Sequence, residues 1–406
     1  MPQRKILQRT LQPRLESLVG QYPAVFLTGP RQSGKTTLAR ATFPTFAYRS
    51  LEDLQNRGEA QEDPRGFLRR FESESGVILD EVQRVPELFS YLQSVLDEER
   101  AGPFVLTGSQ HFLLSEKISQ SLAGRVAILE LLPLSLAELA GRPARPPDEL
   151  GVLHEPDRAT STSAPSISLD QILFQGLYPR IHDRGLESGP WLDAYVRTYV
   201  ERDVRMVSNI GDLDTFVRFV TLCAGRSGQV LNYSSLAADA GVAQPTAKRW
   251  ISVLRAGYIL DLLQPYHRNF DKRLVKSPKL FLVDPGLMCH LLGLRRVDDL
   301  RAHPLRGSIF ETFVLAELRK LFVYHGERPP LYYWRDSRLE IDALVDFGTR
   351  LVPIEVKAGE TLGGDAFRGL HYLGELTGRP NGLVVYGGEE SYPRGEFQIR
   401  SWRDIT

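Results

Sequence analysis

The chain has 406 residues, 42% hydrophobic and 25% charged, so it can bury sizeable cores and is expected to divide into two or three domains. Its 50 basic and 50 acidic side chains cancel, so net charge gives no argument for a polyanionic partner and leaves open only a local basic face. The two cysteines, Cys223 and Cys289, lack metal-ligand spacing, so neither a disulfide framework nor a zinc site is expected and a reducing compartment fits best. No apolar stretch is long enough to span a bilayer and the first residues lack a secretory core. We therefore expect a cytoplasmic protein with no membrane partner.

An octet near the N-terminus, GPRQSGKT, fits the P-loop template G-x-x-x-x-G-K-S/T and follows an apolar run over residues 24–27. Its glycines let backbone N–H groups close around phosphate, Lys35 can reach the β- and γ-phosphates, and the Thr36 hydroxyl can ligate Mg²⁺. The alternative is a glycine-rich connecting turn. The octet predicts ATP and Mg²⁺ as cofactors, with the nucleotide held by Gly29, Pro30, Arg31, Gln32, Ser33, Gly34, Lys35, Thr36 and Thr37.

A second apolar run, GVILD over residues 76–80, delivers two carboxylates at its end. This is the Walker B arrangement, in which Asp80 would hold Mg²⁺ and Glu81 would polarise the water that attacks the γ-phosphate. Acidic residues also follow buried strands without any function. The P-loop upstream favours the catalytic interpretation.

Two further polar residues follow predicted strands of the same domain. Ser109, after the strand 103–106, is a candidate sensor of the nucleotide, or else a cap for the next helix. Arg125, before the strand 126–132, is a candidate to stabilise transition-state charge in its own or a neighbouring subunit, and the alternative is a surface arginine.

Several segments of this region, such as LTGPRQSGKTTLAR, VILDEVQRVPELF and LTGSQHFLLSEKISQSLAGRV, resemble the prokaryotic AAA-type ATPases of the AAA+ superfamily whose C-terminal half is a domain of unknown function. The resemblance spans nearly the whole chain. It implies a P-loop ATPase in which Lys35, Thr36, Asp80, Glu81 and Ser109 match the Walker A, Walker B and sensor positions. It also implies that Arg125 belongs to a Gly-Arg element of the family.

Residues 141–168 are rich in Pro, Ser and Thr and predict a linker or mobile loop before a helical region. Within that region, residues 213–283 predict a winged helix, with a helix, a turn at Gly241, a second helix and a hairpin. The segment 244–279 carries eight basic against two acidic side chains, a local excess of six, and Lys279 is one of the eight. Its predicted DNA contacts are Lys248, Arg249, Arg255, Lys272 and Arg273. Many winged helices instead pack against protein.

Three carboxylates and a lysine stand out in the last hundred residues: Glu311 on a predicted helix, then Asp342, Glu355 and Lys357 on predicted strands. Strand alternation puts Glu355 and Lys357 on one face, and Asp342 would come from the neighbouring strand. Such a set can bind one or two Mg²⁺ ions through Glu311, Asp342 and Glu355 and cleave a phosphodiester. The arrangement resembles the PD-(D/E)xK nuclease superfamily, which implies that Asp342, Glu355 and Lys357 are catalytic. Nuclease folds also serve as binding modules, so the sequence leaves cleavage open.

The predicted organisation is an α/β protein with an AAA-type P-loop parallel-sheet domain over residues 1–140, the linker, a winged-helix-like domain over 169–299 and a restriction-endonuclease-like α/β domain over 300–406. The predicted function is ATP hydrolysis coupled to DNA binding, remodelling (branched DNA or Holliday junctions included) or processing, by a homo-oligomer. The alternative is a nucleotide-controlled protein-interaction switch with an inactive nuclease-like fold, for which the partner is a protein.

Overall fold

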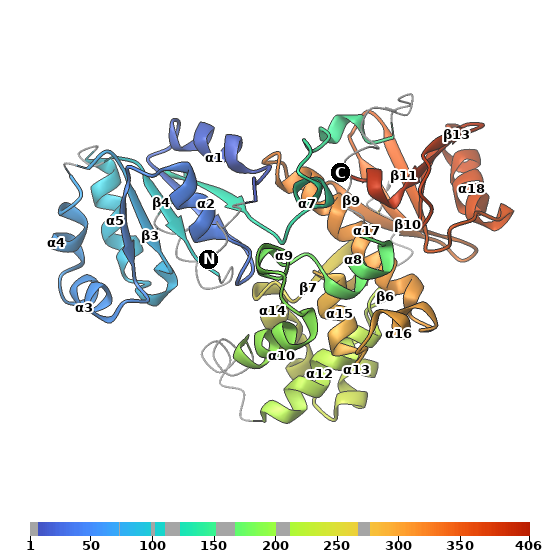
Figure 1. Cartoon of the computed structure of the whole chain (residues 1–406), viewed down its shortest axis with the longest axis horizontal. Helices are drawn as coiled ribbons and strands as arrows, with labels where there is room; N and C mark the ends of the chain where they lie inside the picture. The colour runs from blue at the N-terminus through green and yellow to red at the C-terminus, as the bar shows by residue number, and fades with distance from the viewer. Residues whose placement is uncertain are drawn as a thin grey trace. The chain divides into compact units, whose positions relative to one another are not determined.

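The structure, a computed structural model of the whole chain, describes residues 7–72, 74–98, 102–109, 122–151, 167–199, 212–266 and 277–406. Its contacts divide the chain into two compact units (Figure 1). The N-terminal unit comprises residues 5–134 together with 323–327, and the C-terminal unit comprises residues 135–322 and 328–406. The predicted winged-helix-like and C-terminal domains therefore fall within one unit. A short segment from far along the chain belongs to the N-terminal unit.

The N-terminal unit is built on a parallel five-stranded sheet with the strand order β2-β3-β4-β1-β5. Its strands are β1 (Ala24–Thr28), β2 (Ala47–Ser50), β3 (Val77–Asp80), β4 (Phe104–Thr107) and β5 (Val126–Glu130). Because β1, β3 and β4 are buried along their whole length, they consist of short, almost purely apolar runs. The predicted fold class, α/β with a parallel P-loop sheet, is confirmed.

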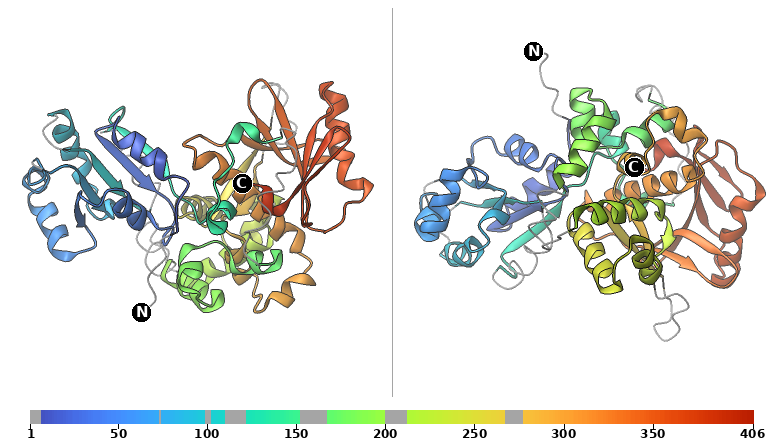
Figure 2. Two further views of the ribbon diagram at one scale, coloured as in Figure 1. Left: turned by 45° about the horizontal axis from the view of Figure 1, so that its top comes forward. Right: turned by 90° about the horizontal axis from the view of Figure 1, so that it is seen from below.

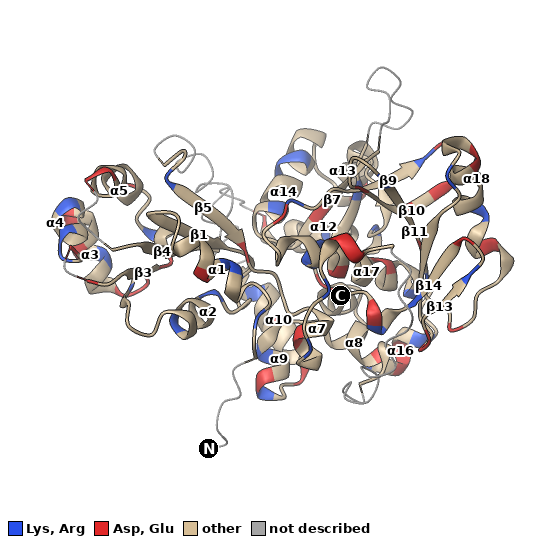
Figure 3. Ribbon diagram, turned by 90° about the horizontal axis from the view of Figure 1, so that it is seen from above, with Lys and Arg blue, Asp and Glu red and all other residues tan. Residues whose placement is uncertain are grey.

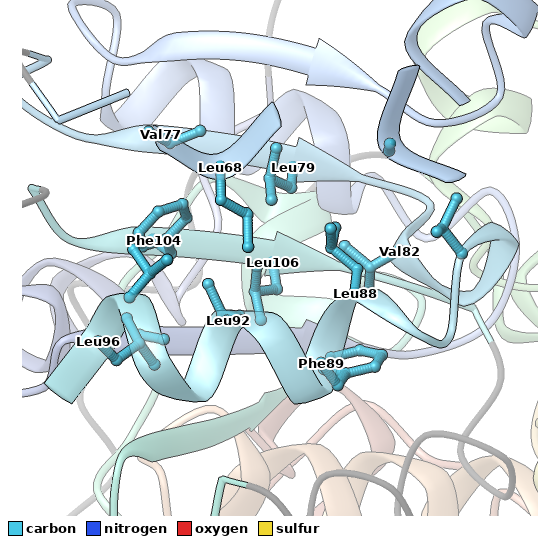
Figure 4. Packing of buried hydrophobic residues seen from close by; sticks show 14 of the residues in the cluster. Leu68, Val77, Leu79, Val82, Leu88, Phe89, Leu92, Leu96, Phe104 and Leu106 are labelled. Atoms are coloured by element: carbon cyan, nitrogen blue, oxygen red, sulfur yellow. The ribbon is translucent and has the colours of Figure 1, made fainter. Parts of the chain in front are cut away.

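Helices and one 3-10 turn pack around this sheet, and apolar residues of α3, α4, η1 and α5 fill one core against it (Figure 4). They are α1 (Gln12–Val19), α2 (Lys35–Thr42), α3 (Leu54–Glu62), α4 (Pro64–Arg69), η1 (Val82–Arg84) and α5 (Leu88–Asp97). In α5 the buried residues recur at helical spacing, with Leu88, Leu92 and Leu96 on one face. Each fully buried leucine contributes about 1.5–3 kcal/mol of transfer free energy, and this core fixes the ends of β3 and β4.

The first part of the C-terminal unit is mainly helical and contains a winged helix. Its helices are α7 (Leu136–Ala140), η2 (Pro147–Glu149), α8 (Leu169–Gln175), α9 (Pro179–Arg184), α10 (Ser188–Thr198), α12 (Leu213–Gly225), α13 (Tyr233–Ala240), α14 (Gln244–Ala256), α15 (Pro285–Leu291), α16 (Val297–Arg301) and α17 (Arg306–Val323). Gly241, with φ +73°, ends α13, and a proline in the first turn of α14 starts the next helix. The strands β6 (Gln229–Val230), β7 (Leu260–Pro265) and β8 (Lys279–Leu282) complete the module.

The hairpin of the winged helix continues into the C-terminal sheet, so nine strands run in the order β13-β14-β12-β11-β10-β9-β7-β8-β6. The added strands are β9 (Leu331–Arg335), β10 (Glu340–Asp346), β11 (Leu351–Lys357), β12 (Gly382–Tyr386), β13 (Tyr392–Arg394) and β14 (Phe397–Ser401). The junction is a parallel pairing of β7 with β9, in which Gln264 lies opposite Tyr332. The helical elements of this part are η5 (Gly364–Phe367), α18 (Arg368–Thr377) and η6 (Trp402–Asp404), and α18 packs on β10 and β11 (Figure 2).

The first described part of the predicted linker, residues 141–151, packs within the C-terminal unit, and its last two residues, 167 and 168, are described where they precede α8. Leu150 is 1% exposed, and Gly151 lies so close to Val352 of β11 that an added Cβ would come within 2.8 Å of it. Arg142 also donates a hydrogen bond to the carbonyl of Arg403. Residues 152–166, the rest of that prediction, lie outside the described residues.

Candidate functional site

The octet predicted from sequence forms a tight loop between β1 and α2. Gly29 has φ +143°, and a Cβ there would lie 2.1 Å from the carbonyl oxygen of Leu131, so only glycine fits. Gly34, with φ +95°, occupies the position before Lys35, the first residue of α2. The loop therefore delivers the N-terminus of a helix, with its free N–H groups, directly after a buried parallel strand.

Two buried side chains of the loop have the chemistry that phosphate needs. The Lys35 ammonium group donates to the carbonyl oxygens of Gly29 at 3.0 Å and Pro30 at 2.8 Å, and only 6% of this residue is exposed. Ser33 is fully buried, and its hydroxyl has no hydrogen-bond partner in the part of the chain that the structure describes. Because buried polar groups are normally satisfied, a cation and an open hydroxyl in this loop fit an anionic ligand.

Asp80, at the end of β3, is the centre of a network of hydroxyl groups. The Thr36 hydroxyl donates to its Oδ1 at 2.8 Å, the Tyr48 hydroxyl donates to its Oδ2 at 2.9 Å, and the Thr107 hydroxyl donates to Oδ1 as well. Burial and the neighbouring Asp80 raise the pKa of Tyr48 to about 12, so it remains a donor. A hydroxyl and a carboxylate in contact are the oxygen donors that Mg²⁺ prefers, so Thr36 and Asp80 fit the predicted ion.

Glu81 and Ser109, predicted as catalytic base and sensor, are connected through Gln83. The Gln83 amide donates to a carboxylate oxygen of Glu81 and, at 3.2 Å, to the hydroxyl of Ser109. Glu81 itself has a left-handed backbone with φ +58°, a conformation that is uncommon for a residue other than glycine. The sequence did not single out Gln83, Tyr48 or Thr107. Thr107, the last residue of β4, was detectable only as a polar residue at a strand end.

Arg125 forms an ion pair with Asp97. Its guanidinium donates to both carboxylate oxygens of Asp97, at 2.5 and 3.0 Å, and the hydrogen bond raises the pKa of the arginine. Both side chains are partly exposed. A role for Arg125 at a phosphate stays a prediction, and it requires that this pair open.

The C-terminal unit brings together the four residues predicted from its sequence. Asp342 lies on β10 within a β-bulge between Ile341 and Leu344, and its Oδ2 accepts a hydrogen bond of 2.8 Å from the backbone of Val356. On β11, the Lys357 ammonium group donates to Glu355 Oε2 at 3.1 Å. Bulges often mark functional positions because they redirect a side chain. Glu311 comes from α17.

Lys279 enters this acidic cluster from the winged-helix strand β8. It belongs to the basic segment 244–279, but it is 1% exposed, so it cannot lie on a DNA-binding surface. Its ammonium group lies 3.3 Å from Glu311 Oε1 and is ion-paired with Glu340. All four residues of β8 are buried, and the helices α12 and α15 pack against this strand. We call Glu311, Glu340, Asp342, Glu355, Lys279 and Lys357 the acidic cluster.

Two carboxyl groups of the acidic cluster have strongly raised pKa values. Burial, reinforced by the neighbouring Asp342, raises the pKa of Glu311 to about 8 and that of Glu355 to about 8. As the cluster stands, no group of three or more His, Cys, Asp or Glu side chains among the described residues could hold a metal ion. Its carboxylates are occupied by lysines and a backbone N–H. The predicted metal set of Glu311, Asp342 and Glu355 therefore stays a prediction.

The raised pKa values predict that the C-terminal unit loses stability as pH rises from about 7 to about 8. In this window the folded state holds protons on Glu311 and Glu355 that the unfolded state, with pKa 4.5, has released, so the free energy of unfolding must fall. The expected loss is on the order of 1 kcal/mol.

Urea unfolding at pH about 7 and about 8 measures this loss of stability. Tryptophan fluorescence reports the unfolding of the C-terminal unit, because Trp191, Trp250, Trp334 and Trp402 all lie in it. The variants Glu311→Gln and Glu355→Gln should each reduce the pH dependence. A free energy that stays constant in the wild type would contradict the raised pKa values.

Helix α14 of the winged helix carries several basic residues (Figure 3). Lys248 and Arg249 are exposed, and Arg255, also exposed, lies 3.9 Å from the carboxylate of Asp261. Lys272 and Arg273, the other two predicted DNA contacts, lie outside the described residues.

Comparison with known proteins places these sites in a family. An AAA domain family matches residues 21–140, and two domains of unknown function, DUF8612 and DUF4143, match residues 166–298 and 306–404. An uncharacterized protein of Mycobacterium tuberculosis is 33% identical over 363 residues, which cover 88% of this chain and 75% of that protein, and one of Mycobacterium bovis matches equally. The chain belongs to the same family as these two mycobacterial proteins. Its residues 21–140, with the P-loop, form an AAA domain of the ATPase type.

Solved structures show more distant likenesses. The Walker-type ATPase of Pyrococcus abyssi is 15% identical, with a TM-score of 0.46, over 71% of this chain and 97% of that one. A RuvB mutant of Thermotoga maritima is 20% identical, with a TM-score of 0.31, over 62% of this chain and 88% of that one.

None of the helices that the structure describes combines the length and apolar character needed to cross a membrane.

Proposed function

We propose that this ATPase couples ATP turnover to the binding and remodelling of DNA held by its winged helix. The observation that carries the proposal is α14, the second helix of the helix-turn-helix. It contains no acidic residue, and it exposes Lys248, Arg249 and Arg255. Helices in this position of a winged helix commonly enter a DNA groove, and Lys and Arg side chains neutralise the phosphates on either side.

The three basic side chains do not contribute equally to this face. Asp261 accepts from Arg319 at 2.5 Å and lies near Arg255, so the charge of Arg255 is partly compensated within the protein. The ammonium group of Lys248 lies over the ring of Tyr233, 5.6 Å from the ring centre, and the residue remains exposed. We therefore expect substitutions of Lys248 and Arg249 to have the largest effect on DNA affinity.

In the proposed ATP reaction, Lys35 neutralises charge on the β- and γ-phosphates, and Thr36 and Asp80 hold the Mg²⁺ ion. That ion supplies electrostatic stabilisation of the phosphate oxygens when bound. Glu81 accepts a proton from the attacking water, and Gln83 orients Glu81. Arg125, released from Asp97, would complete the site of a neighbouring subunit in a homo-oligomer.

The acidic cluster has two alternative functions within this proposal. By its resemblance to PD-(D/E)xK nucleases, Asp342, Glu355 and Lys357 would cleave the bound DNA with Mg²⁺. The ammonium group of Lys279 beside Glu311 favours the other outcome, a nucleotide-controlled interaction protein whose nuclease-like fold binds without cutting. An internal cation already compensates the carboxylates that a metal would need.

The test measures steady-state ATP hydrolysis without DNA and with duplex DNA, single strands or a four-way junction, while DNA integrity is followed on gels. We expect one DNA form to stimulate turnover, and Lys35→Ala to abolish the turnover. The double variant Lys248→Glu/Arg249→Glu should bind that DNA at least about tenfold more weakly, with a shallower salt dependence. Arg184→Glu/Arg197→Glu, which changes two exposed arginines of the same unit, is the matched control.

Turnover that depends on Lys35 but is indifferent to every DNA would overturn the DNA proposal and favour the interaction switch. Cleavage that is lost in Asp342→Ala would assign the acidic cluster as a nuclease site. Cleavage that persists in this variant would come from elsewhere or from a contaminant.

A further inference from the structure

A buried arginine from the start of the chain lies against the P-loop. Arg9, three residues before α1, is 6% exposed, and its Nη1 donates a hydrogen bond of 2.6 Å to the carbonyl oxygen of Ser33. The same nitrogen is the nearest heavy atom, at 3.6 Å, to a Cβ built on Gly34. A charged donor therefore fixes the peptide group that joins the last two loop residues before Lys35.

The orientation of that peptide group matters for phosphate. A trans peptide is planar, so the Ser33 carbonyl and the Gly34 N–H point in opposite directions. When Arg9 holds the carbonyl on one side, the N–H must point to the other, where the loop and the start of α2 present their donors. A hydrogen bond from a guanidinium group is stronger than one between neutral groups, which suits it to hold a loop in one state.

Arg9 is itself held by a residue from the other half of the sequence. Its Nη2 donates to the Leu132 carbonyl at 2.7 Å and to the Tyr324 hydroxyl at 3.0 Å, and its Cζ lies 5.6 Å from the centre of the tyrosine ring. The Tyr324 hydroxyl in turn can donate to Leu132, at 2.8 Å, or to Pro133. Tyr324 is 2% exposed and belongs, with residues 323–327, to the N-terminal unit.

The segment around Leu132 also contacts the first glycine of the P-loop. Leu131 donates its N–H to the Thr28 carbonyl at 2.8 Å, and its own carbonyl excludes any Cβ from Gly29. Arg9 therefore joins the two ends of the P-loop: it binds the end at Ser33 directly and the end at Gly29 through the segment 131–133.

We propose that Arg9 is a positioning residue for the nucleotide phosphates and that Tyr324 sets the position of Arg9. The inference rests on the ATP binding assigned to the P-loop, and it needs no DNA. Tyr324 directly follows α17 in the sequence, and α17 also carries Glu311 of the acidic cluster. Phosphate affinity thus depends on a chain segment that no nucleotide motif includes, and that segment is continuous with the C-terminal unit.

The experiment measures ADP binding to the full chain by titration calorimetry. We expect Arg9→Met to weaken ADP binding at least about tenfold and Tyr324→Phe to weaken it about threefold, since each removes a hydrogen bond that orients the loop. Arg9→Lys, which keeps a charged donor, should recover part of the loss. The double variant Arg9→Met/Tyr324→Phe should bind no more weakly than Arg9→Met alone, because Tyr324 acts through Arg9.

Exposed residues of the same unit provide matched controls, Tyr22→Phe and Arg69→Met, which should leave the affinity unchanged. Tyr324→Phe removes a single oxygen atom, so it tests the inference even if Arg9→Met does not fold. Lys35→Ala should abolish ADP binding in the same assay. The inference would be overturned if Arg9→Met and Tyr324→Phe bound ADP within twofold of the wild type. It would also be overturned if the losses of the two single variants added in the double variant. A wild type that binds no nucleotide would instead overturn the ATPase assignment on which the inference rests.

Discussion

Replacing Glu81 by glutamine is expected to lower the ATP turnover number about 10²- to 10⁴-fold, the usual contribution of a general base. The glutamine keeps the size of the side chain but cannot accept the proton of the attacking water. Lys35, Thr36 and Asp80, which contact the phosphates and Mg²⁺ in the proposed reaction, are unchanged, so ATP affinity should stay within a few-fold of the wild type. Single-turnover hydrolysis and ATP titration separate the two quantities.

Gln83 gives this experiment an internal comparison. Its amide donates to Glu81 and Ser109, so Gln83→Leu should reduce turnover by about tenfold, because Glu81 stays present but loses an orienting partner. The control is Glu87→Gln, which changes an exposed carboxylate six residues after Glu81. Full turnover in Glu81→Gln would show that another group activates the water.

The nucleotide site could be predicted from sequence where its residues are adjacent in the chain. The P-loop and the pair Asp80 and Glu81 are local motifs, and the structure places Thr36 against Asp80. Tyr48 and Thr107 could not be predicted, because they reach Asp80 from β2 and β4. Both strands pair with β3, and no local pattern specifies which strands are neighbours in a parallel sheet.

Lys279 is another residue whose surroundings could not be predicted from the sequence. It was counted in the basic excess of the segment 244–279, which favours a solvated face, but it is 1% exposed, and α12 and α15 pack against its strand. The sheet runs through both predicted C-terminal domains because β7 pairs with β9. The residues joined by that pairing are about 70 positions apart in the sequence. The ion pair of Lys279 with Glu311 likewise joins residues from two different elements, β8 and α17.

Removing one member of the buried pair Glu317 and Lys320 is expected to destabilise the C-terminal unit by about 3–5 kcal/mol. The two side chains lie one turn apart on α17, 2.8 Å from each other, and are 0% and 1% exposed. The second carboxylate oxygen of Glu317 accepts from the backbone of Leu136 and from the Thr406 hydroxyl, each at 2.9 Å. Glu317→Gln or Lys320→Met leaves the partner's charge buried without its ion-pair partner.

Urea unfolding followed by tryptophan fluorescence reports this loss, since all four tryptophans belong to the same unit. The exposed pair Asp193 and Arg197, one turn apart on α10 at 3.0 Å, is the control, and Arg197→Met should cost under about 1 kcal/mol. If the buried pair is needed mainly to avoid an unpaired charge, Glu317→Leu/Lys320→Met should be less destabilising than the sum of its single changes. A loss no larger than that of Arg197→Met would mean that water reaches Glu317 and Lys320.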